Sequence, residues 1–189
     1  MFKIGIVLGS TRPGRRGDQV ARWVHEVAAR RTDVEFEVVD LLDHPLPYVD
    51  EPTPGQYQHE HTRAWAETIG SFDGFVVVTP EYNHSIPGVL KNAFDHLHAE
   101  WGDKAVGFVS YGGVGGARAV EQLRLICGAL RTADVGPQVT LSLLTEFENH
   151  TTFRPGAYNV TALDTLLDNV IAWSAALAPL RAAPPVPIA

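Results

Sequence analysis

The sequence is poor in cysteine and has no long apolar run. Cys127 is the single cysteine, so an internal disulfide and a small disulfide-stapled secreted scaffold are excluded. The first apolar run, residues 4–8, is too short for the core of a signal peptide and leads directly into polar residues. Because no run approaches the length of a membrane span, we expect a cytoplasmic protein that does not contact a membrane.

Positive charge is also scarce. The chain has 15 Lys and Arg against 22 Asp and Glu, which gives a formal net charge of −7. Binding of a nucleic acid needs a basic face for the phosphates, so we expect no nucleic-acid partner. A local cluster of arginines can still bind one small anion in an acidic protein.

Length and composition predict a single globular domain. The chain has 189 residues, of which 45% are hydrophobic and 20% charged, and these are ordinary values for one folded unit. We expect residues 1–181 to form the domain. Residues 182–189 contain three prolines and are expected to be a loose C-terminal tail.

Apolar periodicity predicts that strands and helices alternate five times. Alternation of this kind implies a parallel sheet with helices on both faces. We therefore predict an α/β fold, a three-layer doubly wound sheet of five strands in the flavodoxin-like order 2-1-3-4-5. The expected strands cover residues 3–8, 34–41, 73–79, 104–110 and 138–143, and the expected helices cover 18–30, 60–69, 88–98, 117–130 and 160–180.

In such a sheet, ligands bind outside the carboxyl ends of the strands. The loop after the first strand, residues 9–17, reads GSTRPGRRG. The start of a helix offers free N–H groups to an anion, Ser10 and Thr11 add hydroxyl donors, and arginine side chains suit phosphate. The loop predicts a phosphate site that includes Arg12, Arg15 and Arg16. The alternative is an ordinary turn with solvated arginines.

The type of phosphate follows from what this loop does not contain. A nucleotide-binding P-loop needs Lys and then Ser or Thr where this chain has Arg15 and Arg16. The dinucleotide motif G-x-G-x-x-G fails because residue 11 is Thr. A Ser- and Arg-rich loop without a magnesium ligand suits a monophosphate such as that of FMN.

Two further loops meet the same edge of the predicted sheet. Residues 79–88, TPEYNHSIPG, connect a strand to a helix and offer peptide groups and the aromatic Tyr82 to a flat ring. Residues 110–116, SYGGVGG, have four glycines in five positions, which is tolerated where a backbone approaches a ligand closely. The alternative for the second loop is a connection shaped by its prolines, with Tyr82 partly buried.

These motifs resemble the NAD(P)H-dependent FMN reductases of the flavodoxin-like superfamily, which include quinone, azo-dye and chromate reductases. The resemblance covers about residues 3–145. It rests on Gly-Ser-x-Arg at 9–12, on Thr-Pro-Glu-Tyr-Asn at 79–83 followed by Leu-Lys-Asn-Ala-Phe-Asp at 90–95, and on the glycine loop followed by Ala117 and Arg118.

The resemblance implies which residues bind the cofactor. Ser10, Arg12, Arg16 and the backbone of Gly17 would bind the FMN phosphate, and Arg15 is a further candidate in the same loop. The resemblance places Pro80, Glu81, Tyr82 and Asn83 beside the isoalloxazine ring, and Ser110, Gly112 and Gly113 over its pyrimidine end. Homodimers or homotetramers are usual in this family.

We therefore expect an oxidoreductase with FMN and NADPH or NADH as cofactors. Hydride would pass from the nicotinamide to FMN, and two electrons would then pass to a small-molecule acceptor: a quinone, a nitro or azo compound, a metal ion or free flavin. No catalytic side chain is required. The alternatives are a flavodoxin-type electron carrier without nicotinamide turnover and a flavin-free regulatory module.

We expect no metal site. The pairs His59–His61 and His96–His98 have i, i+2 spacing, and side chains at this spacing on a helix point in different directions.

Overall fold

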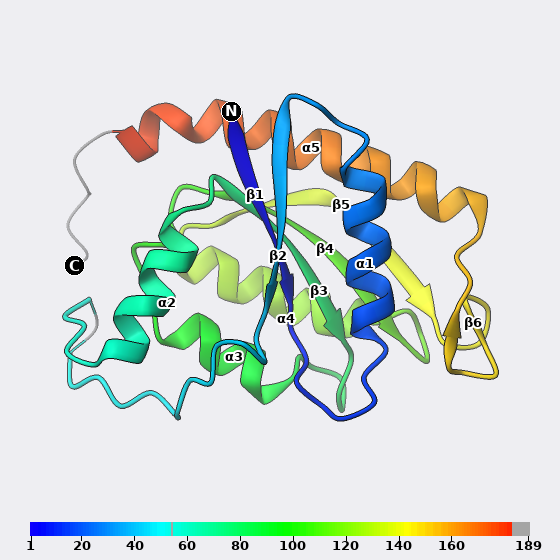
Figure 1. The fold of residues 1–189 in the computed structure, drawn as a ribbon, viewed down its shortest axis with the longest axis horizontal. Helices are drawn as coiled ribbons and strands as arrows, with labels where there is room; N and C mark the ends of the chain where they lie inside the picture. The colour runs from blue at the N-terminus through cyan, green and yellow to red at the C-terminus, as the bar shows by residue number, and fades with distance from the viewer. Residues whose placement is uncertain (54, 183–189) are drawn as a thin grey trace.

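The computed structural model describes residues 1–53 and 55–182. Five parallel strands form one sheet in the order β2-β1-β3-β4-β5, which confirms the predicted fold class (Figure 1). The strands are β1 (Phe2–Leu8), β2 (Val34–Asp40), β3 (Gly74–Pro80), β4 (Ala105–Gly112) and β5 (Ala133–Ser142). The helices are α1 (Gly17–Ala28), α2 (Glu60–Gly70), α3 (Gly88–Asp95), α4 (Ala117–Ala129) and α5 (Ala157–Ala182).

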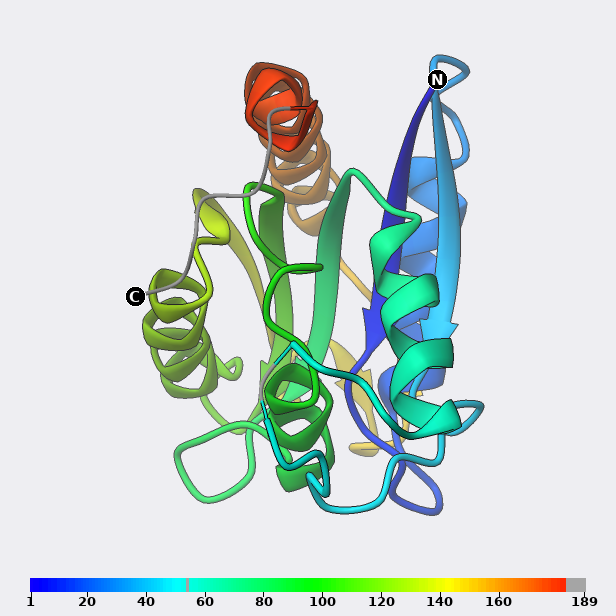
Figure 2. The same ribbon diagram turned by 90° about the vertical axis from the view of Figure 1, so that its left-hand side faces the viewer.

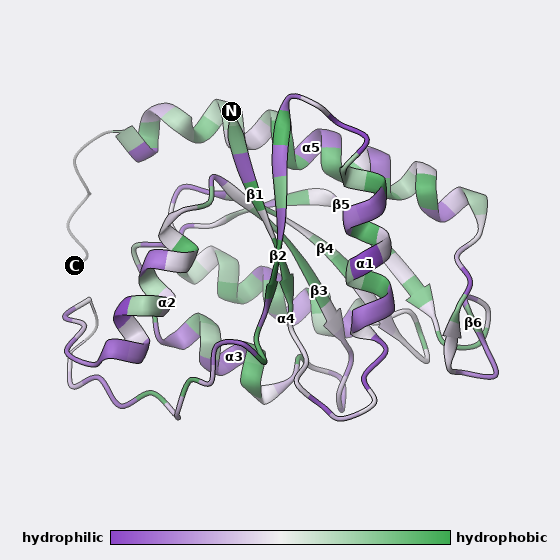
Figure 3. Cartoon of the chain, viewed as in Figure 1, coloured by the Kyte–Doolittle hydropathy of each residue, from purple (hydrophilic) through white to green (hydrophobic). Residues whose placement is uncertain are grey.

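The helices cover both faces of the sheet, as Figure 2 shows. Helices α1 and α5 pack with one face, and α2, α3 and α4 pack with the other, so that the sheet separates two apolar clusters. Every residue of β3 and β4 is buried, because central parallel strands are covered on both sides. In Figure 3 strand β2 and helix α1 accordingly mix polar and apolar residues, since β2 is an edge strand and α1 covers the sheet with one side only.

The register of the parallel strands brings distant residues to one edge. Leu8 at the end of β1 pairs with Asp40 of β2 and with Val78 of β3. Pro80 at the end of β3 pairs with Tyr111 of β4. The loops that follow β1, β3 and β4 therefore begin side by side at the carboxyl edge.

Several segments differ from the sequence-based expectation. Helix α3 ends at Asp95 and not at residue 98, and α5 begins at Ala157 and not at residue 160. Strand β5 begins at Ala133 and not at residue 138, because an edge strand tolerates the Gly136-Pro137 pair that suggested a loop. The expected loop 146–158 contains a short antiparallel hairpin of β6 (Phe147–Glu148) and β7 (Thr152–Phe153). Helix α5 includes Ala182, the first residue of the expected tail, and residues 183–189 lie outside the described residues.

Helix α5 bears on the expectation that no apolar run approaches the length of a membrane span. With 26 residues and a mean hydropathy of 1.2 in its most apolar window, it is long and apolar enough to cross a membrane by length and composition alone. Only 28% of that window is buried. Its inward residues Leu163, Leu166, Leu167 and Val170 nevertheless pack in the core on the sheet. A helix that covers a sheet can be as long and as apolar as a membrane-spanning helix. The length and hydropathy of α5 are therefore weak evidence that it spans a membrane.

Cys127 on α4 is fully buried. Burial raises the pKa of its thiol to about 12, so the thiolate that would make it reactive is not populated near neutral pH.

Candidate functional site

A cavity of about 570 Å³ opens at the carboxyl edge of the sheet. This size falls within the range of roughly 300–1,000 Å³ typical of cofactor and small-molecule sites. All three loops singled out in the sequence contribute to it, together with the β6–β7 hairpin. Its lining residues are Arg12, Pro13, Gly14, Arg15, Arg16, Pro80, Glu81, Tyr82, Tyr111, Gly112, Leu143 and His150.

The loop after β1 presents free backbone donors. Among the described residues, the N–H groups of Ser10, Thr11, Gly14 and Arg16 have no hydrogen-bond acceptor. The Ser10 side chain is fully buried, and its Oγ lies 3.0 Å from the Tyr82 hydroxyl. This bond joins the first loop to the second. Unpaired N–H groups that precede a helix form a ready anion site.

The arginines of this loop differ in their surroundings. Arg12 is exposed, its guanidinium lies 5.9 Å from the centre of the Tyr82 ring, and within the described part of the chain it forms no ion pair. Arg15 is almost buried and is bound by two carboxylates: its Nη1 lies 2.7 Å from Asp40 Oδ1, and its Nε lies 2.8 Å from Asp18 Oδ1. Arg12 therefore supplies positive charge to the cavity, whereas the charge of Arg15 is neutralised.

The ion pair is reflected in the pKa of Asp40. Partial burial raises this pKa, but hydrogen bonds from Arg15 and from the Leu42 N–H outweigh burial and lower it below its ordinary value. The Asp40 carboxylate therefore stays ionised near neutral pH, and it keeps Arg15 paired.

Arg16 and Gln19 connect the first loop to the β6–β7 hairpin. Arg16 Nε donates to the carbonyl oxygen of His150 at 2.9 Å. Gln19 donates to the Thr151 carbonyl at 2.8 Å and accepts from the Phe153 N–H at 2.9 Å. These bonds place the hairpin, including His150, against the cavity.

The loop after β3 begins with a tight turn. Tyr82 and Ser85 exchange two backbone hydrogen bonds of 2.9 and 3.0 Å, and the residues between them, Asn83 and His84, have φ values of 51° and 68°. Positive φ at both central positions defines a type I′ turn, in which Asn is favoured. The turn directs Asn83 and His84 to solvent.

Glu81 is held by the first turn of α4. Its carboxylate accepts from Arg118 Nε at 2.6 Å and from the Arg118 N–H at 3.2 Å. Burial raises the pKa of Glu81, but Arg118 outweighs it and lowers the pKa below its usual range. Glu81 is therefore an ionised positioning residue that fixes the second loop to α4.

The glycine loop after β4 is stabilised by a hydrogen bond within the loop. Ser110 is fully buried, and its hydroxyl donates to the Gly115 carbonyl at 2.7 Å. Gly116 has a φ of 78°, and a Cβ atom at this position would lie 2.9 Å from the Tyr111 backbone nitrogen. Only glycine fits there without strain. Gly113 lies in open space with no atom within 4 Å of its Cβ position.

A comparison with protein families identifies the fold's relatives. The model of the NADPH-dependent FMN reductase family matches residues 2–146. The chain belongs to this family. The predicted family, the oxidoreductase class and the use of FMN and a nicotinamide cofactor are thereby confirmed.

Two relatives agree with this family, and one solved structure shares the fold. An NAD(P)H-dependent FMN reductase of Schizosaccharomyces pombe, C4B3.06c, is 45% identical over 146 residues, which are 74% of this chain and 73% of that protein. A 2-hydroxy-1,4-benzoquinone reductase of Burkholderia sp. is 36% identical over 136 residues, 68% of this chain and 72% of that protein. The solved structure of FerB, an NAD(P)H:(acceptor) oxidoreductase from Paracoccus denitrificans, matches with a TM-score of 0.74 at 20% identity, over 93% of this chain and 98% of FerB.

The structure of this family member brings most of the predicted site residues to one cavity. Seven line it: Arg12, Arg15, Arg16, Pro80, Glu81, Tyr82 and Gly112. Ser10 lies behind it and bonds to Tyr82. Gly17 is buried between the Leu8 side chain and the Tyr111 hydroxyl, where a Cβ atom would collide with both. Ser110 bonds within its own loop, and Asn83 and Gly113 face solvent.

Sequence reasoning missed Leu143 and His150, which also line the cavity. Both follow β5, and the His150 Nδ1 lies 3.1 Å from the Leu143 carbonyl oxygen. The one sequence feature that could have indicated these residues is that their loop follows a strand, and so begins at the carboxyl edge. The loop was passed over because it has no cluster of glycines or arginines like those in the other loops.

Proposed function

We propose that FMN binds in the cavity at the carboxyl edge, and that the protein transfers electrons from NAD(P)H through FMN to a quinone. The observation that carries the proposal is the set of unpaired N–H groups from Ser10 to Arg16 beside the free guanidinium of Arg12. Together they fit a phosphate that carries negative charge. The second and third loops form the rest of the cavity together with Leu143 and His150.

Each loop has its own role in this proposal. The N–H groups of the first loop and Arg12 bind the phosphate. Pro80, Glu81 and Tyr82 lie beside the flavin ring, and Gly112 covers it. Ser10 positions Tyr82, and Arg118 positions Glu81, through the hydrogen bonds described above. Arg15 carries no phosphate contact in this proposal, because Asp40 and Asp18 bind its guanidinium.

FMN held by these loops would supply the redox chemistry, which is hydride uptake from the nicotinamide and transfer of two electrons to the acceptor. The protein contributes binding, orientation and backbone dipoles, and no side chain acts as a nucleophile. Among the acceptors considered, a quinone is favoured by the benzoquinone reductase to which this chain is similar. Membership in a family of reductases favours this enzyme over an electron carrier.

The first experiment is a visible spectrum of the purified protein with FMN, recorded without oxygen before and after NADPH or NADH is added. We expect the flavin band to bleach promptly and to return when a benzoquinone is added. Steady-state oxidation of NADPH with a benzoquinone, an azo dye or excess free FMN then ranks the acceptors by kcat/KM.

Three outcomes contradict parts of the proposal. A flavin band that persists with both nicotinamides supports the electron carrier. A protein that binds no FMN even in excess overturns the assignment of the cavity. Bleaching that a benzoquinone does not reverse, while azo dye or free FMN does, rejects the quinone as acceptor.

We also propose that the protein is a homo-oligomer. A second depression of about 620 Å³ lies between α3 and α4 and is lined by Ile86, Leu125, Ile126, Ala129 and Leu130 among others. Leu125 is 71% exposed, and exposed apolar patches of this kind mark protein interfaces. The cytoplasmic location stays a prediction from the sequence.

A further inference from the structure

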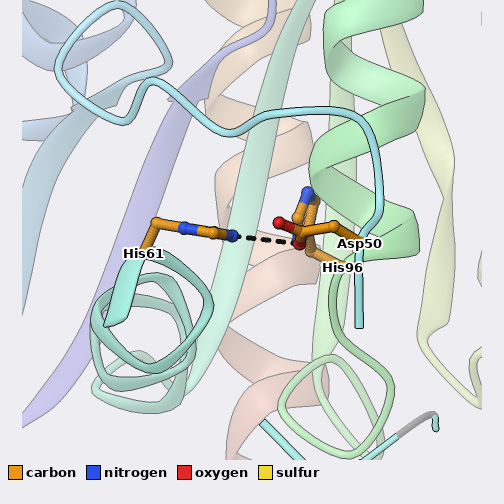
Figure 4. A group of neighbouring side chains, drawn as sticks. All are labelled: Asp50, His61 and His96. Carbon is orange, nitrogen blue, oxygen red and sulfur yellow. Dashed lines mark hydrogen bonds and ion pairs between the residues drawn. The ribbon is translucent and has the colours of Figure 1, made fainter. Parts of the chain in front are cut away.

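Asp50, His61 and His96 converge in a cluster of potential metal ligands, and none of them lines the cavity at the carboxyl edge. One potential ligand atom from each residue lies within 4.8 Å of the other two. His61 Nε2 is 3.1 Å from Asp50 Oδ1, and Figure 4 shows the His61 ring and the carboxylate pointing toward each other beside His96. His59 stacks on His61 with ring centres 5.3 Å apart, and its Nε2 lies 3.9 Å from Asp50 Oδ2.

The fold holds these residues together from three segments. Asp50 lies in the long loop after β2, and His61 lies in the first turn of α2. The neighbouring Glu51 carboxylate accepts from the N–H groups of Gln58 and His59 at 2.8 and 3.0 Å, which fixes the loop against the start of α2. His96 follows directly after α3 and is 97% buried, with 3% of its surface exposed.

The His96 ring can coordinate without losing its support. Its Nε2 lies 2.9 Å from the Pro47 carbonyl oxygen, and its Nδ1 lies 3.4 Å from the Thr62 hydroxyl. Because a carbonyl oxygen can only accept, Nε2 carries the proton for Pro47 and Nδ1 holds the lone pair. Coordination through Nδ1 keeps the bond to Pro47, whereas coordination through Nε2 gives that bond up and leaves the Thr62 hydroxyl as the partner of Nδ1. Ligating histidines in metal sites commonly have such a partner on their second nitrogen, which fixes the ring and its tautomer.

We propose that Asp50, His61 and His96 bind a Zn²⁺ ion, with His59 beside the fourth position. Two imidazole nitrogens and one carboxylate oxygen are ligands that Zn²⁺ prefers, whereas Mg²⁺ prefers oxygen ligands alone. Zinc–ligand distances of about 2.0–2.2 Å require the ligand atoms to draw slightly closer. Asp50 and His61 are 38% and 32% exposed, so their side chains are free to make that adjustment.

The expectation of no metal site came from considering each histidine pair alone. His59 and His61, like His96 and His98, are two residues apart. The site instead combines one member of each pair with Asp50 from a third segment. An ion there would tie the loop after β2 to the end of α3, independently of whether FMN binds.

The test is calorimetric titration of the full-length protein with Zn²⁺, with Mg²⁺ as a second probe. We expect Zn²⁺ to bind with a stoichiometry of about one and Mg²⁺ not to bind. His61→Gln and Asp50→Asn should each weaken Zn²⁺ binding by at least tenfold. Loss of a residue that only hydrogen-bonds to a metal ligand already costs about tenfold in affinity, so loss of a ligand itself should cost at least as much. His98→Gln is the matched control, because it removes an imidazole two residues from His96 but outside the cluster, and it should bind Zn²⁺ like the wild type.

Thermal unfolding gives a second readout. A ligand that binds the folded state raises Tm, so Zn²⁺ should raise the Tm of the wild type and of His98→Gln but not of His61→Gln. The proposal is overturned if the wild type does not bind Zn²⁺, or if His61→Gln and Asp50→Asn bind it as tightly as the wild type. Neither result bears on the flavin site, where the four backbone donors and Arg12 lie.

Discussion

Arg12 and Arg15 show how two arginines of one loop acquire different roles. Arg12 is exposed beside Tyr82 and is available to a ligand, whereas Arg15 is bound to Asp40 and Asp18. A guanidinium without a carboxylate partner contributes its charge to a bound anion. A paired guanidinium contributes mainly to the stability of the fold.

The role of Arg12 is tested by Arg12→Gln. A hydrogen bond to a charged group contributes about 1.5–3 kcal/mol, so we expect FMN affinity to fall by about 10- to 150-fold, with little change in stability. The measurement is titration of FMN by the quenching of its fluorescence. Arg22→Gln, an exposed change of equal charge on α1, should leave the affinity unchanged. Equal affinities for Arg12→Gln and the wild type would remove Arg12 from the phosphate site.

Arg15→Gln should instead destabilise the fold. Breaking a buried ion pair costs about 3–5 kcal/mol; since the Asp40 side chain is 22% exposed, we expect about 1–3 kcal/mol at neutral pH. The pKa of Asp40 is lowered in the folded state, so its contribution is present above its unfolded pKa of about 3.9 and is lost as the pH falls further.

Urea unfolding of the wild type and Arg15→Gln at pH 7 and near pH 3 measures this effect. The difference in unfolding free energy should be full at pH 7 and should narrow below about pH 4. A difference that stays constant down to pH 3 would show that Asp40 is not the partner that matters.

The sequence indicated the arginine-rich loop but not which arginine is free. That depends on Asp40, which is 25 residues away and reaches the loop because the parallel register places it beside Leu8. Likewise, the importance of His150 depends on a hairpin that is bonded to Arg16. Such contacts are set by tertiary packing, which local patterns do not encode.

At the scale of elements, the glycines of the loop between β4 and α4 differ in whether the structure requires glycine at their position. Gly116 needs a positive φ and close approach to Tyr111, whereas Gly113 meets neither condition. The loop stays closed through the buried bond from Ser110 to Gly115. Its first part lines the cavity through Gly112, and its last part is a tight turn that requires glycine.

Gly116→Ala should destabilise the protein by about 2–4 kcal/mol, because a left-handed conformation costs an alanine about 1–2 kcal/mol and the new Cβ collides with backbone. Gly113→Ala, three residues earlier in the same loop, should change stability by no more than about 0.5 kcal/mol. Chemical denaturation of both variants makes the comparison. If both lose similar stability, the loop is uniformly strained and the distinction is wrong.

Elements with strong periodicity were predictable from the sequence. The buried strands β1, β3 and β4 and helices α1, α2 and α4 lie within two residues of their expected bounds. Strand β5 and the β6–β7 hairpin were mispredicted because edge and hairpin strands are half exposed and contain turn-forming residues. Burial on one side alone leaves a weaker pattern.

At the scale of the whole molecule, some apolar side chains remain exposed to solvent outside the two apolar clusters on either side of the sheet. The face between α3 and α4 retains Leu125 in solvent, beside the ion pair of Lys91 and Asp95. Apolar residues exposed together lose the stabilisation of about 25 cal/mol per Å² that burial would give. A second copy of the chain over this face would recover it.

The proposed interface is tested by Leu125→Glu. A charge placed on a covered apolar face would be desolvated at a high cost, so we expect an assembled wild type of at least twice 20.6 kDa and a monomeric variant in light scattering. Leu144→Glu is the matched control, because Leu144 is equally exposed at 71% but lies in the loop after β5. A monomeric wild type rejects the oligomer, and an assembled Leu125→Glu moves the interface to another face.

The second loop, residues 79–88, runs directly into α3, which borders the proposed interface. If the partner subunit supports that loop, loss of assembly should also weaken FMN binding. Titration of the Leu125→Glu monomer with FMN measures this coupling.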